Sequence, residues 1–389
     1  DGAPRWQRQL GIIPSSAPVS TQAGLLLVDG DGGAVSVPAT GVSLPSATTT
    51  ASPEWIAAPP IDGITSPTKV IPSPDGKTVF TISTTGEGEI AKWVIRRAVN
   101  GKFDRQSIVK AKGEIAGTPA FFNGTLLIPA ADGFIYRLVI AGRVDEDSLV
   151  AGPKWLLSRN VENPECFVAP IANETFLTSD GGKILKRWTW PAGGTYLDDN
   201  ASWNIRQRIA SAPLVLSTAG KPTRLLVADV TGGIWLYGLD RGDTPIRRWI
   251  PGKTLALPPG KVSPHFAEQH DASGRQLAAY TVNAKKLVCL DVDADEPRWI
   301  ASMKDDAASN LVGSPLAFGL GRWLTTDLGG RVSILNAENG QPELTREVGL
   351  PGAVPETIGV PIGDNRVLVP LNDGSAAIVN LASEPKAKE

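Results

Sequence analysis

The sequence predicts an all-β protein, an eight-bladed β-propeller with four antiparallel strands in each blade. Three observations predict this fold. A proline motif recurs at a mean spacing of 49 residues, each copy contains apolar runs joined by Gly-rich turns, and tryptophans recur at the same period. Fixed periods of roughly 20 to 50 residues are typical of repeat architectures. We therefore expect one domain over residues 1–382, followed by a polar C-terminal tail over residues 383–389.

The first strand of each predicted blade begins at a small residue followed by proline. Successive prolines of this motif are separated by 43 to 52 residues, and no copy is missing from the series. The copies are Ala17-Pro18, Ser66-Pro67, Thr118-Pro119, Ala169-Pro170, Ala212-Pro213, Ser263-Pro264, Ser314-Pro315 and Val360-Pro361.

A Gly-rich hairpin joins the second and third strands of each blade. Asp-Gly and Gly-Gly between alternating apolar runs predict type I′ or II′ turns, because glycine adopts positive φ without steric cost. Two copies have weaker turns, at residues 85–88 and 283–285. Each copy therefore predicts an antiparallel meander. Clear examples are the segments 25–37, 126–140, 176–188, 225–240, 323–336 and 367–381.

A fourth strand completes each blade, and tryptophan marks six of the eight. Of the two blades without it, one has Ser107 near the missing place and the other has Leu344. A large aromatic side chain on an outer strand covers the seam between neighbouring sheets. Burying about 200 Å² at roughly 25 cal/mol per Å² is worth several kcal/mol. We interpret all six as packing residues: Trp6, Trp55, Trp155, Trp203, Trp249 and Trp299.

The two ends of the chain predict how the last blade is completed. A fourth strand, from Trp6 to Leu10, precedes the first proline motif, whereas the eighth meander ends at Leu381 without a fourth strand. Adding the N-terminal strand to the last blade closes the ring and removes exposed sheet edges. Helical signals are nearly absent, with at most one turn expected over residues 305–310.

Composition and charge exclude several classes of protein. The chain has 38 Lys and Arg against 40 Asp and Glu, a net charge of −2, and no run of five like charges. This balance offers no electrostatic footprint for a nucleic acid or an anionic membrane. No apolar stretch reaches the length of a transmembrane helix. Because the chain begins with Asp1 and has no signal-peptide core, we expect a processed chain or an excised domain.

The blade pattern resembles the quinoprotein-type (PQQ-like) repeat. Two segments carry the resemblance, "SAPLV…LLVADVTGGIWLYGLD…RRW" from Ser211 and "GSPLAF…TTDLGGRVSILNAENGQPEL" from Gly313. The likeness extends over residues 15–381 and the N-terminal strand. This repeat occurs in quinone-dependent dehydrogenases and in non-catalytic propellers similar to BamB. The second group implies a scaffold role in the cell envelope and a periplasmic or exported location.

The residues favour the non-catalytic group. A quinone with Ca²⁺ needs a carboxylate base, oxygen ligands and cationic contacts, and the alcohol dehydrogenases of this class place a disulfide of adjacent cysteines above the ring. Here Cys166 and Cys289 are far apart in the sequence. The acidic segment 291–295 is interpreted as a solvated turn. We predict no catalytic residue, no cofactor and no metal ligand, with a quinone- and calcium-dependent dehydrogenase as the alternative.

Five residues are candidates for contacting a partner. Four belong to "KRWTWP", where aromatic and basic residues lie together as in an interface hot spot. Packing at a blade seam is the competing interpretation for the two tryptophans. The fifth, a histidine, begins a strand expected to line the central channel, and a structural role is its competing interpretation. The candidates are Lys186, Arg187, Trp188, Trp190 and His265.

The predicted function is that of a non-enzymatic scaffold, a rigid disc whose loop faces bind partner proteins. Preformed loops lose little entropy on association, which suits this role. A glycan-binding propeller is a further alternative, motivated by Trp188 and Trp190. The sequence predicts no nucleic-acid partner and no transmembrane segment, and it leaves the oligomeric state open.

Overall fold

The computed structural model describes most of the chain. Trp55, Pro264 and the predicted tail at 383–389 lie outside the described residues, and side chains are not described for residues 6–9, 38 and 56. The described residues are 6–38, 56–157, 164–172, 174–218, 220, 222–240, 242–251, 261–262, 265–348, 352–362 and 365–381.

The fold is an eight-bladed β-propeller with four antiparallel strands per blade, as the sequence predicts. Blades 1 to 4 follow one another along the described chain. Blade 1 comprises β2 (Val19–Thr21), β3 (Gly24–Val28), β4 (Ala34–Pro38) and β5 (Ile56–Ala58). Blade 2 comprises β6 (Ile64–Pro72), β7 (Thr78–Thr85), β8 (Lys92–Val99) and β9 (Lys102–Lys110). Blade 3 comprises β11 (Ala120–Phe122), β12 (Thr125–Pro129), β13 (Phe134–Val139) and β14 (Ser148–Lys154), and blade 4 comprises β15 (Cys166–Ala172), β16 (Thr175–Ser179), β17 (Ile184–Thr189) and β18 (Leu197–Asn204).

Blades 5 to 8 repeat the same strand order. Blade 5 comprises β19 (Leu214–Leu216), β20 (Arg224–Ala228), β21 (Ile234–Gly238) and β22 (Arg247–Trp249). Blade 6 comprises β23 (Ala267–His270), β24 (Gln276–Val282), β25 (Lys286–Asp291) and β26 (Pro297–Ser302). Blade 7 comprises β27 (Leu316–Ala317), β28 (Arg322–Thr326), β29 (Arg331–Asn336) and β30 (Pro342–Glu347), and blade 8 comprises β31 (Val360–Pro361), β32 (Arg366–Pro370), β33 (Ser375–Asn380) and the N-terminal β1 (Trp6–Gln9).

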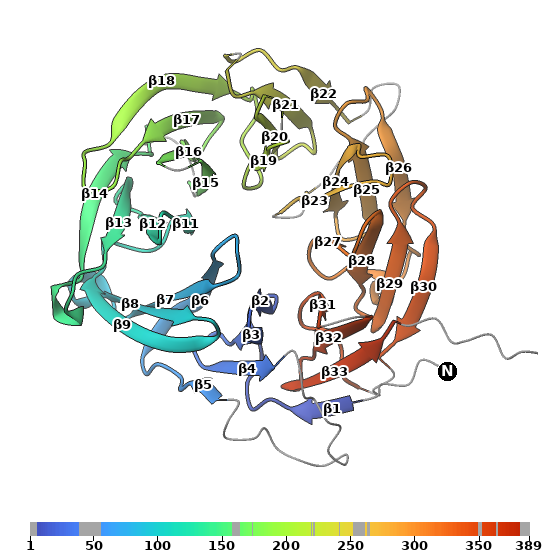
Figure 1. The fold of residues 1–389 in the computed structure, drawn as a ribbon, viewed down its shortest axis with the longest axis horizontal. Helices are drawn as coiled ribbons and strands as arrows, with labels where there is room; N and C mark the ends of the chain where they lie inside the picture. The colour runs from blue at the N-terminus through green and yellow to red at the C-terminus, as the bar shows by residue number, and fades with distance from the viewer. Residues whose placement is uncertain are drawn as a thin grey trace, which may run out of the picture. The chain divides into compact units, whose positions relative to one another are not determined.

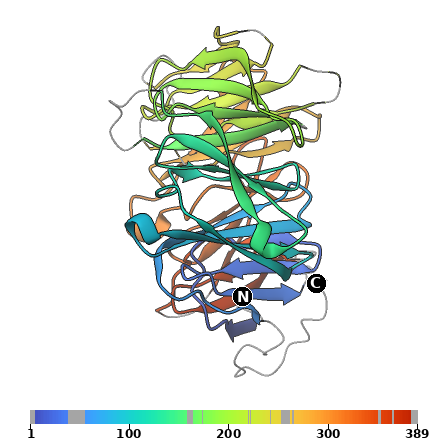
Figure 2. The same ribbon diagram turned by 90° about the vertical axis from the view of Figure 1, so that its left-hand side faces the viewer.

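Helix is confined, in the described residues, to short 3₁₀ turns, one of them in the loop where a single turn was expected. They are η2 (Gly88–Ile90), η3 (Val144–Glu146) and η4 (Ala307–Ser309). The chain divides into two compact units. Unit 1 holds blades 1, 6, 7 and 8, and unit 2 holds blades 2 to 5, so each unit is considered by itself below. Figure 1 labels the strands of both units, and Figure 2 shows the green strands of unit 2 turned by 90°.

The N-terminal strand completes the last blade, as predicted. β1 pairs antiparallel with β33, with Trp6 opposite Ile378 and Gln9 opposite Ser375. The Leu10 amide extends the ladder by donating to the Gly374 carbonyl at 2.9 Å. Figure 1 shows β1 beside β33 at the edge of blade 8. The order in this sheet is therefore β31, β32, β33 and β1, which joins the two ends of the described chain.

The core of each unit lies between neighbouring blades. In unit 2, clusters of buried side chains join blades 2 and 3, blades 3 and 4, and blades 4 and 5. In unit 1, similar clusters join blades 6 and 7, blades 7 and 8, and blades 8 and 1. Each blade therefore packs against a neighbour on both of its faces. Because both faces are buried, the sequences of the second and third strands are nearly continuous apolar runs.

Two tryptophans of the fourth strands lie in these seams and each donates a hydrogen bond to the next blade. Trp203 of β18 is 1% exposed and donates through Nε1 to the Gly238 carbonyl of blade 5 at 3.4 Å. Trp299 of β26 donates in the same way to the Ala337 carbonyl of blade 7 at 2.8 Å. A buried indole N–H needs such an acceptor. The packing interpretation is thus confirmed for these two tryptophans.

The hairpin turns differ from the prediction in one respect. In blade 5 the Asp229 amide donates to the Gly233 carbonyl and Gly232, at φ 86°, donates to the Asp229 carbonyl, so the loop has three residues. This is a turn followed by a left-handed glycine rather than a two-residue I′ or II′ turn. The cause is the aspartate side chain, whose Oδ1 accepts the Gly233 amide at 2.9 Å. Blades 1 and 7 repeat this arrangement at Asp29 and Asp327.

A short parallel pairing ties the first strands of blades 3 and 4 together. β10 (Gly117–Thr118) lies alongside the start of β15, with Gly117 opposite Cys166. The Cys166 amide donates to the Ala116 carbonyl at 2.7 Å. Gly117 has φ 149°, and a Cβ there would overlap the Cys166 backbone. Only glycine permits this close approach of two backbones.

Candidate functional site

The structure divides the "KRWTWP" cluster between the two faces of blade 4. Successive residues of a strand point to opposite faces. Trp188 packs in the core shared with blade 3, where Lys186 lies over its ring at 4.9 Å. Arg187 points the other way and donates to the Leu239 carbonyl of blade 5 at 3.5 Å. The four residues, adjacent in sequence, therefore do not form one surface.

Both tryptophans of this cluster are buried. Trp188 is 6% exposed and donates to Thr178 Oγ1 at 2.9 Å, and Trp190 is 2% exposed and donates to the Gly194 carbonyl at 3.1 Å. Tyr196 packs edge-on against both rings, with centroid distances of 5.9 Å. Neither indole offers an open face for stacking on a sugar, which removes the observation that motivated glycan binding.

The basic side chains of the cluster are held by carboxylates. Lys186 Nζ lies 2.5 Å from Asp198 Oδ2, and this bond lowers the pKa of Asp198 below its usual range. Arg187 Nε lies 3.0 Å from Asp199 Oδ2. These pairs cross from β17 to β18 and fix the two strands to each other. Partner binding by Lys186 and Arg187 stays a prediction.

His265 lies apart from this cluster in the fold. It precedes β23 by two residues, in the loop that leads into blade 6, and it is exposed. The sequence places it at the start of a strand, whereas the structure places it just outside one. Its role as a partner contact likewise stays a prediction.

A groove opens where the cluster meets blade 3, within unit 2. It has a volume of about 430 Å³ and is lined by Arg137, Val139, Val150, Trp190 and Gly194, among others. Its walls come from the β11–β12 turn, the ends of β13 and β14, and the β17–β18 loop. In an antiparallel meander the connections after the first and third strands lie at the same end. The groove therefore sits on one loop face of blades 3 and 4.

Arg137 is the central polar group of this groove. Its guanidinium lies 5.6 Å from the centroid of Phe122 and 5.6 Å from that of Trp190, so it is stacked between rings of two blades. It donates through Nη1 to the Pro191 carbonyl at 3.2 Å. No carboxylate in the described ranges forms an ion pair with it. Burial lowers the pKa of Arg137, and the charge of Glu174 opposes this shift.

Apolar side chains surround the groove and stay in contact with solvent. Val139 is 39% exposed and Val150 is 44% exposed, both on the groove wall. Tyr196 and Leu197, which follow Trp190 in the chain, are 38% and 58% exposed. An Arg and a Trp within an apolar rim have the composition of an interface hot spot. Trp190 is thus the one predicted residue that the structure places in this groove.

Sequence reasoning missed Arg137 and the valines. Arg137 is the single charged residue in the apolar strand β13, and that pattern indicates a strand without indicating what the side chain contacts. Its two aromatic partners are 15 residues before it and 53 residues after it in the chain. Only the folded seam brings them together. No signal in the sequence marks the stacked guanidinium.

The cysteines and acidic residues form no recognisable reactive centre in the described part of the chain. Cys166 and Cys289 are buried free thiols, and burial raises the pKa of both. The acidic segment forms a turn between β25 and β26, in which Asp291 accepts the Asp293 amide at 3.0 Å. Asp293 and Asp295 are exposed as predicted, whereas Asp291 ends β25 and is only 8% exposed. Within the described ranges no three His, Cys, Asp or Glu side chains are grouped to hold a metal ion.

Comparisons with known proteins match this chain at the level of structure. No protein-family model and no curated protein matches it. The structure is similar to BamB from Moraxella catarrhalis, with a TM-score of 0.61 and 13% identity over 97% of this chain and 99% of that one. The computationally designed Ika8 protein gives 0.59 and 13%, over 96% and 98% of the two chains.

A further similarity is to Raptor from Chaetomium thermophilum, with a TM-score of 0.51 and 11% identity over 81% of this chain and 29% of that one. At such low identity these similarities establish the fold. In the described residues no helix has the length and apolar character needed to cross a membrane.

Proposed function

We propose that this chain is a non-enzymatic, protein-binding scaffold propeller that docks a partner protein in the Arg137–Trp190 groove. The observation that carries the proposal is the stacked guanidinium of Arg137, which has no ion-pair partner in the described ranges and lies among exposed apolar side chains. A partner segment with a carboxylate beside an apolar side chain complements this arrangement, since Arg binds carboxylates through two parallel hydrogen bonds.

The groove is preformed, which favours binding over catalysis. Phe122, Trp190 and the Pro191 carbonyl hold Arg137 in one place, so little side-chain entropy is lost when a carboxylate binds. The arrangement contains a cation and hydrophobic walls but lacks a nucleophile or general base paired for a reaction among its described lining residues. A role in cell-envelope or membrane-associated assembly, and a periplasmic or exported location, are part of the proposal and are supported by the fold-level similarity to BamB.

Site-specific photo-crosslinking in cells tests the proposal. A benzophenone amino acid replaces Val150 in the groove wall, and in a control it replaces Ile108, which is 56% exposed on β9 of blade 2. We expect discrete protein adducts from Val150 that weaken in the Arg137→Gln background. Identical adducts from both positions, or none from Val150, would contradict docking in this groove.

A further inference from the structure

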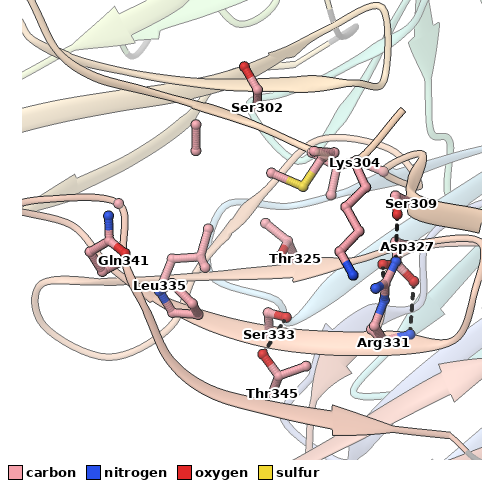
Figure 3. Close-up of a pocket in the computed structure, with 15 residues that line it drawn as sticks. Ser302, Lys304, Ser309, Thr325, Asp327, Arg331, Ser333, Leu335, Gln341 and Thr345 are labelled. Atoms are coloured by element: carbon pink, nitrogen blue, oxygen red, sulfur yellow. Dashed lines mark hydrogen bonds and ion pairs between the residues drawn. The ribbon is translucent and has the colours of Figure 1, made fainter. Parts of the chain in front are cut away.

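A second groove lies in unit 1, at the seam between blades 6 and 7. Its volume is about 440 Å³, within the range of about 300 to 1,000 Å³ that is usual for ligand pockets. One wall is formed by the end of β26 and the loop after it, and the other by β28, β29 and β30 (Figure 3). The groove differs from the one in unit 2 because its lining is rich in hydroxyl groups.

Lys304 points into this groove (Figure 3). Its ammonium has no hydrogen-bond or ion-pair partner among the described residues. The other cation, Arg331, is held in place: Nε lies 2.7 Å from Asp327 Oδ2 and Nη2 donates to Ser309 Oγ at 2.7 Å. Asp327 offsets the charge of Arg331. The positive charge of Lys304 is therefore not neutralised by any other residue that lines the groove.

The two carboxylates next to Lys304 in the chain bind other groups. Asp305 Oδ1 lies 2.5 Å from Lys285 Nζ. Asp306 accepts the Ser309 amide at 2.7 Å and so holds the loop that forms this wall. The loop therefore presents its ammonium to the groove while both carboxylates bond other groups. Hydrogen bonds from Ser309 lower the pKa of Asp306, and the charge of Lys304 is a minor contributor to this shift.

Three hydroxyl side chains form a row across the floor of the groove. Thr325, Ser333 and Thr345 stand opposite one another on β28, β29 and β30. Ser333 and Thr345 hydrogen bond to each other at 3.0 Å (Figure 3). A hydroxyl has one donor and two acceptor sites, so each keeps capacity for a ligand hydroxyl.

Apolar side chains complete the lining. Leu311 and Leu335 are each 6% exposed, and Met303 packs with them in the core shared by blades 6 and 7. They supply a surface for the C–H face of a small ring, next to the row of hydroxyls. The groove thus combines an unpaired cation, hydrogen-bonding groups and an apolar wall.

We propose that this groove binds a small hydroxylated molecule that carries one oxyanion, of the kind represented by a sugar phosphate or a sugar acid. The Lys304 ammonium binds the oxyanion, while Ser333 and Thr345 hydrogen bond the ligand hydroxyls. This site belongs to unit 1 and does not rest on the protein-binding role proposed for the groove in unit 2.

Isothermal titration calorimetry with three matched probes tests the charge requirement. Glucose 6-phosphate, glucuronate and uncharged glucose share a ring and differ in the oxyanion. We expect saturable binding of at least one of the two anions, and at least tenfold weaker binding of glucose, a factor equal to about 1.4 kcal/mol. Comparing the two anions identifies whether phosphate or carboxylate is preferred.

Three variants assign the site. Lys304→Gln is expected to weaken anion binding about tenfold, and Lys304→Arg is expected to retain it. The control is Lys92→Gln, which removes the same charge from an exposed end of β8 in unit 2 and should leave anion binding unchanged. Both lysines are exposed, so the folds of the variants are checked by circular dichroism. Absence of saturable binding by both anions, equal affinity for glucose, or full binding by Lys304→Gln would each overturn the proposal.

Discussion

Arg105 and Asp147 form a two-point ion pair that joins blade 2 to blade 3. Arg105 Nε lies 2.8 Å from Asp147 Oδ2 and Nη2 lies 2.5 Å from Oδ1, across 42 residues of sequence. The Asp147 side chain is 1% exposed and also accepts from Ser107. Ser107 is near the place where the fourth strand of blade 2 lacks a tryptophan. A buried ion pair thus occupies the seam that an indole fills in blades 4 and 6.

Removing one partner of this pair should destabilise the protein. Asp147→Asn leaves the Arg105 guanidinium without its carboxylate partner, so the free energy of unfolding should fall. Urea unfolding at pH 7 measures the loss. Asp104→Asn, on the strand that carries Arg105, is the matched control, because the more exposed Arg97–Asp104 pair at 2.6 Å should contribute less than about 1 kcal/mol. Equal losses for the two variants would contradict the prediction.

The same pair predicts a dependence of stability on pH. Burial raises the pKa of Asp147, but hydrogen bonds from Arg105 and Ser107 outweigh it and hold the pKa below its usual value. A folded-state pKa below the unfolded one stabilises the fold above the unfolded pKa of about 3.9. This stabilisation is lost as the pH falls through the folded-state pKa. The difference in unfolding free energy between wild type and Asp147→Asn should therefore become smaller below about pH 4. A difference that stays constant with pH would contradict the stabilising role of the ionised Asp147.

Gly117 should tolerate no side chain. Gly117→Ala forces a Cβ into the Cys166 backbone and should cost about 2 kcal/mol or more in the free energy of unfolding. Gly142→Ala is the control, since Gly142 lacks a positive φ and a Cβ there meets no atom within 4 Å. Hydrogen exchange should show faster exchange of the Cys166 amide in Gly117→Ala. Unchanged stability would mean that the parallel pairing adds nothing to the fold.

Ala284 is a position where glycine should stabilise the protein. Asn283 and Ala284, at φ 52° and 56°, form the turn that connects β24 to β25. The Lys285 amide donates to the Val282 carbonyl across this turn at 3.1 Å. Positive φ costs alanine about 1 kcal/mol relative to glycine. Ala284→Gly should therefore raise the melting temperature, whereas Ala294→Gly, at a position without positive φ, should lower it slightly. A lower melting temperature for Ala284→Gly would show that the positive φ of Ala284 does not strain the protein.

Quinone binding is expected to be absent. Titration of the protein with pyrroloquinoline quinone and Ca²⁺ should give no stoichiometric absorbance change and no dye-linked alcohol oxidation. The same titration on a quinone-dependent alcohol dehydrogenase serves as the positive control. A saturable spectral shift with this chain would establish the dehydrogenase alternative and end the non-enzymatic proposal.

The repeat predicted most of the fold because each strand type carries a local signal. The motif proline comes directly before the first strand in several blades, for example Pro213 before β19 and Pro315 before β27. In blades 2 and 4 the strand starts earlier than the motif predicts, because Pro67 and Pro170 lie inside β6 and β15. Tryptophan marks β18, β22 and β26 as outer strands. In blades 1, 5 and 7 the predicted turn type was wrong because the carboxylate of an aspartate stabilises a three-residue loop, and this depends on side-chain geometry more than on the glycines.

The candidate site was predicted less well, for two physical reasons. Lys186 and Arg187 are neighbours in sequence, yet the period of two in a strand sends them to opposite faces, which the pattern of β17 already implied. Arg137 could not be found in this way. Its environment is made by Phe122 on its own blade and Trp190 on the next, and contacts across a seam leave no local periodicity.

The pairing of β1 with β33 has a consequence for how the chain reaches its fold. Trp6 and Ile378 are paired across 372 residues of sequence (378 − 6), so β1 has no native partner strand until the intervening residues are synthesised. At about 5 to 20 residues per second, the N-terminal strand remains unpaired for roughly 20 to 75 s. Completion of blade 8 is then a late step of folding. During synthesis the nascent chain carries a free strand edge that a chaperone, or a second nascent chain, is able to bind.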